Sequence, residues 1–388
     1  MKIGIQDASE KRGMILTEML LEEGLEVTAF NDRNGVEAVR TALKNQMEIS
    51  PGFNVNSDGY EFFINGNPIR ITGEEKAEDI LWGKSGVQIV ELCSGRSLSA
   101  SLAMGHSFNT NVDGDTANDT NVEYIISSGE VRGVKHLVVG INHEDFTLKD
   151  KVVTVGSPLA RAMAFPLKAL TDHSGIRFSS MDYLAIIPKV PSLGYVEKTN
   201  VQLGFPEVGS EVKQIVPKLD CKIKGYAFEV DTPEGTPKAG WVQLTLYYSD
   251  QEGISTNGLT EILKDAESNY EGRLGIIRTL GPKAIESDQK KLGYKNRSNK
   301  YEMAMVPLEN PGLQDITIRE YSKHASVVVL PRCSAKFTPT GGYAGDGDEE
   351  ELQGVGIIKL LIGYDQDTAS AFDQALLTKY IVKRVEEK

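Results

Sequence analysis

The chain has 388 residues, of which 40% are hydrophobic and 25% charged, which is typical of a globular protein with room for two domains. Its formal net charge of −13 argues against nucleic acid and anionic membranes as main partners. No stretch approaches the roughly 18 consecutive apolar residues of a membrane span, and the first residues lack the apolar run of a signal peptide. The three cysteines (Cys93, Cys221 and Cys333) are far apart, so we expect a reducing, cytoplasmic environment rather than disulfides.

The N-terminal part alternates strands and helices, which predicts a parallel, doubly wound sheet in an α/β fold. An Asn-Gly pair between two short apolar runs adds a hairpin to this pattern. The expected strands are 3–5, 26–30, 61–64, 68–72, 87–92, 122–127, 137–141 and 152–155, and the expected helices are 10–23 and 35–45.

Beyond this part the strands become longer and alternate more clearly between apolar and polar residues. Such alternation predicts a mixed or antiparallel sheet with one covered face. Two polar segments rich in glycine and acidic residues, 107–121 and 338–351, are expected to be inserted surface loops. The other expected elements are strands 176–187, 222–230, 241–248, 327–330 and 355–364, a helix over 258–269 and a closing helix over 369–385.

Residues 152–168, VVTVGSPLARAMAFPLK, predict a buried strand, a tight turn and a helix. Many α/β enzymes place a nucleophile in such a turn, because backbone N–H groups and the helix dipole favour negative charge there. This turn offers Pro158, which has neither a nucleophilic atom nor an N–H. The sequence therefore predicts an elbow without the usual chemistry.

Several long strings resemble the glyceraldehyde-3-phosphate dehydrogenase family along nearly the whole chain. The resemblance implies a Rossmann-like domain over 1–155, completed by the C-terminal helix 367–388, and a mixed-sheet α+β domain of the substrate-binding type over 156–366. The strings are KIGI at the start, VTAFND (27–32), FFINGNPIRIT (62–72), ILWGKSGVQIVELCSG (80–95), VVGINHEDF (138–146), VKQIVPKLDCKIKGYAFEV (212–230) and KLLIGYDQD (359–367).

The family's catalytic residues have no counterpart in these strings. Its elbow reads Ser-Cys-Thr-Thr-Asn, with the Cys as nucleophile, where this chain has Pro158 followed by Leu159 and Ala160. The position matching its general-base His is Ala185. Without a thiol and an imidazole, the family's covalent mechanism has neither nucleophile nor base. Its phosphate-binding positions are likewise replaced by Leu159, Ala160, Pro188 and Glu229.

The dinucleotide-binding turn also departs from the family. Asp7 and Ser9 stand where the family has glycines that let the backbone approach a pyrophosphate, and Asp7 and Glu10 add negative charge that Lys11 and Arg12 offset in part. Asp32 keeps a position able to hold a ribose hydroxyl. Ser94-Gly95 resembles part of the family's nicotinamide-side loop. Gln366 stands where the family's last strand has the Asn that orients the nicotinamide. We therefore expect no bound cofactor, while nucleotide binding through Asp32 stays open.

The remaining reactive residues predict no site. Cys93 is conceivable as a substitute nucleophile, but a small buried apolar residue at a strand end fits its context better. The histidines show no metal spacing, and His143 is interpreted as structural. The acidic run 346–351 lacks the spaced ligands of a calcium loop and is expected to be solvated or to contact a basic partner.

These observations predict a catalytically inactive member of the family that serves as a structural or scaffolding subunit of a cytoplasmic assembly, in contact with copies of itself or with other proteins. Strand 240–250 carries Trp241, Leu244, Leu246 and Tyr248, which face either a partner or the chain's own core. The segment 191–217 is shorter than the family's, whose loop reaches a neighbouring subunit. The alternatives are an NAD(P)-dependent oxidoreductase with altered chemistry and a nucleotide- or metabolite-binding regulatory subunit.

Overall fold

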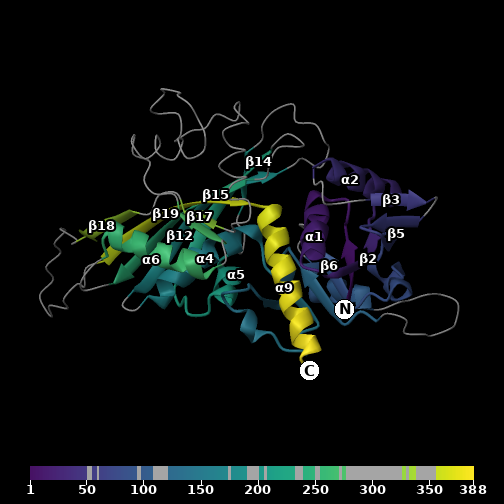
Figure 1. The fold of residues 1–388 in the computed structure, drawn as a ribbon. Coiled ribbons are helices and arrows are strands. Elements are labelled where there is room, and N and C mark those ends of the chain that lie inside the picture. The colour runs from purple at the N-terminus through teal and green to yellow at the C-terminus, as the bar shows by residue number, and fades with distance from the viewer. Residues whose placement is uncertain are drawn as a thin grey trace, which may run out of the picture. The chain divides into compact units, whose positions relative to one another are not determined.

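The computed structural model describes two compact units, Met1–Pro158 with Asp367–Lys388, and Leu159–Gln366 (Figure 1). Each unit is built around its own sheet. The described residues are 1–49, 55–58, 61–93, 98–107, 121–173, 176–189, 201–204, 208–231, 239–249, 254–270, 273–276, 326–328, 332–337 and 355–388.

The sheet of the first unit has the strand order β10-β11-β8-β6-β1-β2-β5-β4-β3 among the described residues. All pairs from β10 to β5 are parallel, and β3, β4 and β5 pair antiparallel. The strands are β1 (Lys2–Gln6), β2 (Glu26–Asn31), β3 (Val55–Asp58), β4 (Glu61–Ile64), β5 (Asn67–Thr72), β6 (Ile89–Leu92), β8 (Tyr124–Ser127), β10 (Lys135–His136) and β11 (Val152–Thr154).

Both faces of this sheet are buried. On β6, Ile89 belongs to one apolar cluster and Val90 to another, and on β8 the same holds for Ile126 and Ile125. Neighbouring residues of a strand point to opposite faces, so the two clusters cover the two sides. The longer helices of this unit are α1 (Lys11–Glu22), α2 (Val36–Ile49) and the C-terminal α9 (Thr368–Glu386), and the short α3 spans Ala100–Met104.

The expected hairpin is confirmed. β4 and β5 are joined by Asn65 and Gly66, with φ of 51° and 83°. Positive φ at both turn positions is the geometry in which a two-residue turn matches the twist of the strands, and Asn-Gly adopts it at the lowest cost.

The sheet of the second unit has the order β13-β14-β12-β15-β19-β17-β16, with β18 also paired to β19. β12 and β14 are parallel, and β15 is antiparallel to β12 and to β19. The strands are β12 (Arg177–Lys189), β13 (Val201–Gly204), β14 (Lys222–Asp231), β15 (Ala239–Ser249), β16 (Leu274–Ile276), β17 (Ser326–Val328), β18 (Arg332–Phe337) and β19 (Val355–Asp365).

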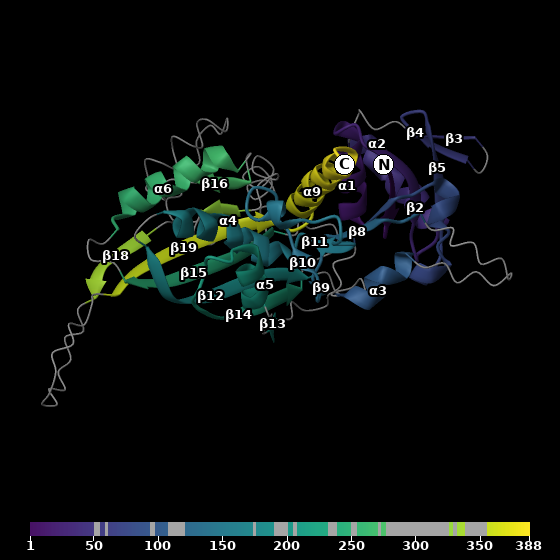
Figure 2. The same cartoon turned by 90° about the horizontal axis from the view of Figure 1, so that it is seen from below.

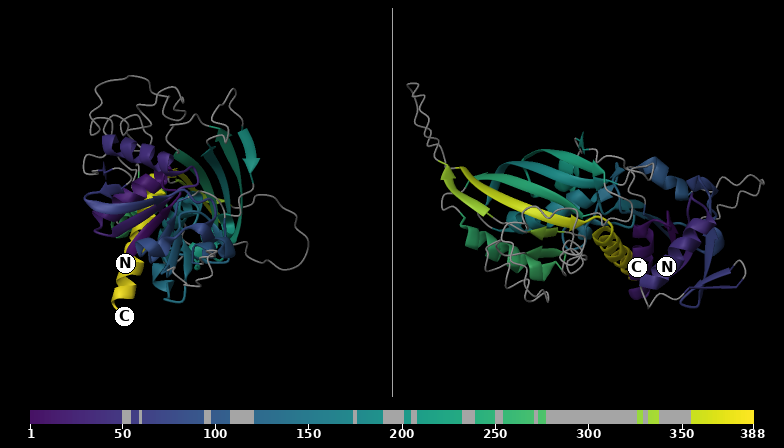
Figure 3. Two further views of the ribbon diagram at one scale, coloured as in Figure 1. Left: turned by 90° about the vertical axis from the view of Figure 1, so that its right-hand side faces the viewer. Right: turned by 90° about the horizontal axis from the view of Figure 1, so that it is seen from above.

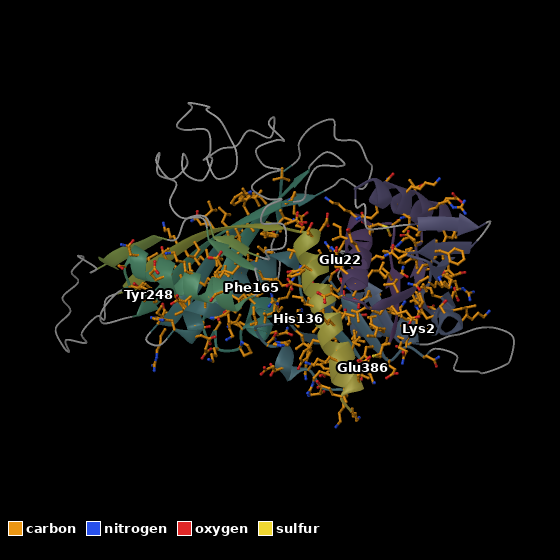
Figure 4. The ribbon with its side chains drawn as sticks, in the orientation of Figure 1. Lys2, Glu22, His136, Phe165, Tyr248 and Glu386 are labelled. Carbon is orange, nitrogen blue, oxygen red and sulfur yellow. The ribbon has the colours of Figure 1, made fainter. Side chains whose placement is uncertain are left out.

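Helices cover one face of this second sheet. α4 (Pro158–Asp172), α5 (Val208–Ile215) and α6 (Thr256–Asn269) lie below it in Figure 1 and in front of it in Figure 2, whereas the view from above in Figure 3 (right) shows the strands in front. Phe165 of α4 and Tyr248 of β15, both labelled in Figure 4, are buried side chains of this unit. The expected α/β class, with a Rossmann-like sheet and a second mixed sheet, is therefore confirmed.

Aromatic rings lie over glycines on neighbouring strands of the second sheet. A Cβ on Gly225 would come within 2.3 Å of the Tyr183 ring, and one on Gly356 within 2.3 Å of the Tyr248 ring. These residues are direct cross-strand partners. The missing side chain leaves room for the ring, which covers backbone that would otherwise be exposed.

One expected strand is wrong. Residues 137–141 form a turn, and the edge strand β10 lies two residues earlier. The Asn142 side chain causes this, because its Nδ2 donates to the His136 carbonyl at 2.7 Å and its Oδ1 accepts from the Val138 N–H at 2.8 Å. In the sequence, a run of apolar residues that is buried in such a turn looks the same as a short buried strand, so the two cannot be distinguished from the pattern alone.

Some expectations lie outside the described residues. They are positions 108–120 of the first expected insertion, the whole of the second, the Ser94-Gly95 pair, and residues 191–200 and 205–207 of the shortened segment. Among the described helices, none is long and apolar enough to cross a membrane.

Candidate functional site

The elbow after β11 is a rigid turn that leads apolar residues into the core. The Gly156 N–H donates to Thr154 Oγ1 at 2.9 Å, and Gly156 has a φ of 79°. Pro158 is the first residue of α4, a position where the missing N–H costs no helical hydrogen bond. Leu159 and Ala160 are buried. The elbow thus packs α4, and Pro158, where the family resemblance would place the nucleophile, carries no nucleophilic atom, whereas its neighbour Ser157 has a half-buried hydroxyl.

The position matching the family's general base lies in a row of small and branched apolar residues. Ala185 of β12 pairs with Ala227 of β14 and Val242 of β15, and all three are at most 1% exposed. Pro188, three residues further along β12, is also buried. None of these side chains can accept a proton.

The β1–α1 turn holds a carboxylate. Asp7 has a φ of 56°, a conformation that glycine adopts most easily, and it is only 5% exposed. The Arg33 guanidinium binds this carboxylate through Nε at 3.2 Å and Nη2 at 3.1 Å. Arg33 therefore compensates the charge that Asp7 brings into the turn, a contact absent from the sequence-based expectation.

Asp32 closes the same turn from the end of β2. Its side chain is fully buried, one oxygen accepts the Ser9 N–H at 2.7 Å, and the other accepts the Asn34 N–H at 2.9 Å. Both carboxylate oxygens thus already hold backbone groups. A carboxylate retains further lone pairs, so a ribose hydroxyl is still a chemically reasonable partner.

The close approach of helix and turn depends on Gly13. A Cβ on Gly13 would lie 2.9 Å from the carbonyl oxygens of Asp7 and Ala8. This is the role of the last glycine in a dinucleotide-binding fingerprint, the tight packing of the helix on the strand. The turn thus has a packing glycine at this position, together with Asp7 and Ser9 earlier in the turn.

Arg12 points into the first unit. It is 8% exposed, its Nη1 donates to Ser128 Oγ at 3.1 Å, and its Nη2 lies 3.5 Å from Asp367 Oδ1 at the start of α9. The guanidinium of Arg12 therefore also binds acceptors in the core of this unit, contacts that the sequence did not predict.

Glu91, which the sequence analysis did not single out, lies in the centre of the first sheet. It is fully buried on β6 and contacts two residues of α9, with Gln374 Nε2 at 2.6 Å from Oε2 and Thr378 Oγ1 at 2.6 Å from Oε1. Burial raises the pKa of Glu91 to about 8. A single acidic residue in the apolar run VQIVELC was the signal that could have identified it.

Cys93 is buried directly after the end of β6, two residues beyond Glu91. Burial and the nearby Glu91 carboxyl raise the pKa of its thiol well above the ordinary value. Only the thiolate is a good nucleophile, so this environment favours the packing role that the sequence predicts. Cys221 is also buried, with a raised pKa, and the side chain of Cys333 lies outside the described residues.

Two of the histidines have clear contacts inside the first unit. His106 accepts the Trp82 Nε1–H at 3.2 Å through Nδ1, and burial lowers its pKa to about 4. His143 accepts the Gly140 N–H at 3.0 Å and packs its ring against Tyr380. Within the part of the chain that the structure describes, no cluster of His, Cys, Asp and Glu is suited to a metal ion.

The sheet of the second unit has an exposed apolar side, which we call the outer face. Leu184 and Ile186 of β12 lie beside Tyr226 and Phe228 of β14, and Trp241 of β15 lies beside Ile186. All five are at least 36% exposed. The sequence left open whether the apolar residues of 240–250 face inward or outward. Trp241 faces outward, whereas Leu244, Leu246 and Tyr248 are buried on the opposite side.

Comparison with known proteins reveals a distant relationship to glyceraldehyde-3-phosphate dehydrogenases. The protein of that name from Zymomonas mobilis is 27% identical over 226 residues, which is 55% of this chain and 64% of the relative. Those from Phytophthora infestans and Lactococcus lactis are 25% identical over 191 residues and 23% identical over 252 residues. The matches cover 54% and 71% of these two proteins, so the chain spans less than two thirds of the Phytophthora and Zymomonas relatives. No protein-family model matches.

These relatives correct one expectation. All of them carry the name of an enzyme, which contradicts the expectation that this chain is not one. That expectation treated the loss of one mechanism as the loss of all catalysis. The absence of a Cys at the elbow and of a His on β12 excludes one covalent mechanism, but other chemistry can operate on the same fold.

Proposed function

We propose that the chain is a structural subunit of a protein assembly, and that it self-associates through the outer face. The main observation that supports this proposal is the location of the exposed apolar side chains. Of the six large ones among the described residues, five lie on the outer face and only Leu102 lies elsewhere. A contiguous apolar patch of this kind marks an interaction site, whereas scattered apolar residues do not.

The outer face is similar in area to one side of a standard protein interface. The strands β14, β12, β15 and β19 are adjacent, and each has at least 10 residues. With strands about 4.8 Å apart and a rise of about 3.3 Å per residue, four such strands present on the order of 600 Å². A standard interface buries about 800 Å² per partner, so this face supplies most of one.

The distribution of side chains on this face resembles the core and rim of an interface. Tyr226, Leu184 and their apolar neighbours occupy one end, and Trp241 packs its ring over Gly363 of β19. Two residues before Leu184 and Tyr226 along the strands, Lys224 is the cross-strand neighbour of Asp182, and both residues are exposed. An apolar centre with charged residues at its edge is the usual anatomy of protein interfaces. A second copy of the chain offers the same surface, so a twofold axis can pair the two apolar zones.

A pair of matched variants tests this proposal. Leu184→Glu places a charge in the apolar zone, and Leu102→Glu makes the same change at the exposed leucine of the first unit. An interface hot spot contributes about 2 kcal/mol and occurs twice in a twofold dimer, so we expect Leu184→Glu to raise the dissociation constant at least about a hundredfold. Sedimentation equilibrium over a range of concentrations measures this constant.

The expected result is a dimer for the unaltered chain and for Leu102→Glu, and a monomer for Leu184→Glu. Equal dissociation constants for the two variants would overturn the outer face as the interface. A monomer that binds a different protein through this face would overturn self-association and leave the face as a docking surface.

A second candidate function is dinucleotide-dependent oxidation and reduction. The observation in its favour is Asp32, which directly follows β2 and accepts the Ser9 N–H of the β1–α1 turn, while Gly13 keeps helix and strand in close contact. Isothermal titration with NAD⁺ tests this function, using the unaltered chain, Asp32→Ala and Asp7→Gly. Stronger binding by Asp7→Gly and weaker binding by Asp32→Ala would support it. No binding by any of the three would exclude it.

A further inference from the structure

The contact between β6 and α9 is polar at its centre. Ser370, Gln374 and Thr378 are spaced by four residues, so they lie on one side of α9, and all three are fully buried. Opposite them, Glu91 is a carboxyl group in a sheet whose other central side chains are mostly apolar. Within the described part of the chain, neither an ion pair nor a charged neighbour influences Glu91, and its only polar partners are Thr378 and Gln374.

The hydrogen bonds around Glu91 require one more hydrogen than an ionised carboxylate allows. Gln374 Nε2 lies 2.6 Å from Glu91 Oε2 and 3.2 Å from the Ile126 carbonyl, and its two hydrogens serve both. Thr378 Oγ1 lies 2.6 Å from Glu91 Oε1 and 2.8 Å from the Gln374 carbonyl, but a hydroxyl has a single hydrogen. Four short contacts therefore share three hydrogens.

A proton on Glu91 completes this network. The carboxyl O–H then donates to Thr378 Oγ1, Thr378 donates to the Gln374 carbonyl, and Gln374 Nε2 donates to Glu91 Oε2 and the Ile126 carbonyl. Every contact has a hydrogen, and no net charge is buried, which removes the largest cost of placing an acid in a core. We propose that Glu91 is protonated in the folded chain and that this proton is a latch that holds α9 on β6.

The surroundings agree with the proposal. The neighbouring titratable group is Cys93, which directly follows β6. The charged groups near Cys93 are Arg12 and Glu10 at the start of α1 and Asp7 of the β1–α1 turn. On α9, Asp373 precedes Gln374 and is buried. Burial raises the pKa of Glu91 to about 8, so the acid holds its proton at neutral pH and loses it under mildly alkaline conditions.

The sign of the pH effect follows from linkage. The pKa of Glu91 is higher with α9 docked than with α9 undocked, where a solvated carboxyl titrates near its ordinary value. The latch therefore contributes its full stabilisation below that ordinary value, and the contribution is lost as the pH rises through about 8. Alkaline conditions favour release of α9, the last helix of the chain.

Amide hydrogen exchange along α9 measures the latch directly. Glu91→Gln is the matched neutral variant, because its NH₂ donates to Thr378 and its carbonyl accepts from Gln374 at every pH. Glu123→Gln is the control, since Glu123 is exposed next to β8 and accepts a hydrogen bond from Gln88. Comparison of variants at the same pH cancels the intrinsic effect of hydroxide on exchange.

From about pH 6 to about pH 9, we expect exchange in α9 to accelerate on the order of a hundredfold in the unaltered chain and in Glu123→Gln, relative to Glu91→Gln. The same pH profile in all three would overturn the proposal. Infrared spectra of the unaltered chain with isotope-labelled glutamate provide a measurement that needs no variant. A protonated-carboxyl band at neutral pH that disappears with a midpoint near 8 is expected, and its absence would overturn the proposal.

Discussion

The two sheets of this molecule differ in how many faces they bury, and each carries one exception to its own pattern. The sheet of the first unit is covered on both faces, yet it holds the acid Glu91 at its centre. The sheet of the second unit has one covered face, yet its outer face exposes Leu184, Ile186 and their aromatic neighbours. A buried acid and an exposed apolar face are both costly, which is why such exceptions point to function.

A substitution on the covered face of the second sheet is expected to have the largest effect on the free energy of unfolding. Gly225→Ala places a Cβ within 2.3 Å of the Tyr183 ring on the covered face, so the ring must move in a packed core. We expect a loss of about 3 kcal/mol in the free energy of unfolding, measured by urea denaturation. Gly258→Ala is the control, because its Cβ would meet only ordinary contacts at 3.4 Å and beyond. Equal effects of the two would refute the importance of the tyrosine–glycine pairing.

The first unit is expected to lose stability in acid through His106. Burial lowers the pKa of His106 to about 4, below the value of about 6.5 in unfolded chains. Its contribution is therefore complete above about pH 6.5 and is lost as the pH falls toward about 4. We expect the unaltered chain to lose about 2 kcal/mol between about pH 7 and about pH 5 that His106→Asn does not lose.

The asparagine at this position keeps an acceptor for Trp82 but does not titrate. His173→Asn is the control, because His173 is exposed at the end of α4. Urea denaturation at several pH values measures the difference. If the free energy of unfolding of His106→Asn falls with pH as steeply as that of the unaltered chain, other groups cause the acid sensitivity.

The outer face gives the smallest expected effect on folding. Tyr226 is 53% exposed, so Tyr226→Ser should change the free energy of unfolding of the monomer by no more than about 0.5 kcal/mol. The measurement uses protein dilute enough to be monomeric. A large loss would mean that the outer face belongs to the core of the chain, and the proposed interface would then lose its main support.

The sequence by itself predicts the elements whose signals are local. The Asn65-Gly66 turn needs positive φ at both residues, so it identifies its hairpin without tertiary information. The elbow before Pro158 is likewise encoded by neighbouring residues, and α4 begins where the turn chemistry places it. The long strands β12, β14, β15 and β19 of the second sheet were predictable because one covered face imposes alternation along each strand, whereas the shorter β13, β16 and β18 were not predicted.

Only the tertiary structure decided which distant residues meet. Residues 137–141 have the apolar pattern of a strand but form a turn, because Asn142 hydrogen-bonds their backbone. Arg12 lies next to the phosphate turn in sequence, yet Ser128 and Asp367 bind it in the core. Hydrogen bonds across hundreds of residues leave no periodic signal along the chain. For the same reason the sequence contains Glu91, Gln374 and Thr378, but only folding brings them together around one proton.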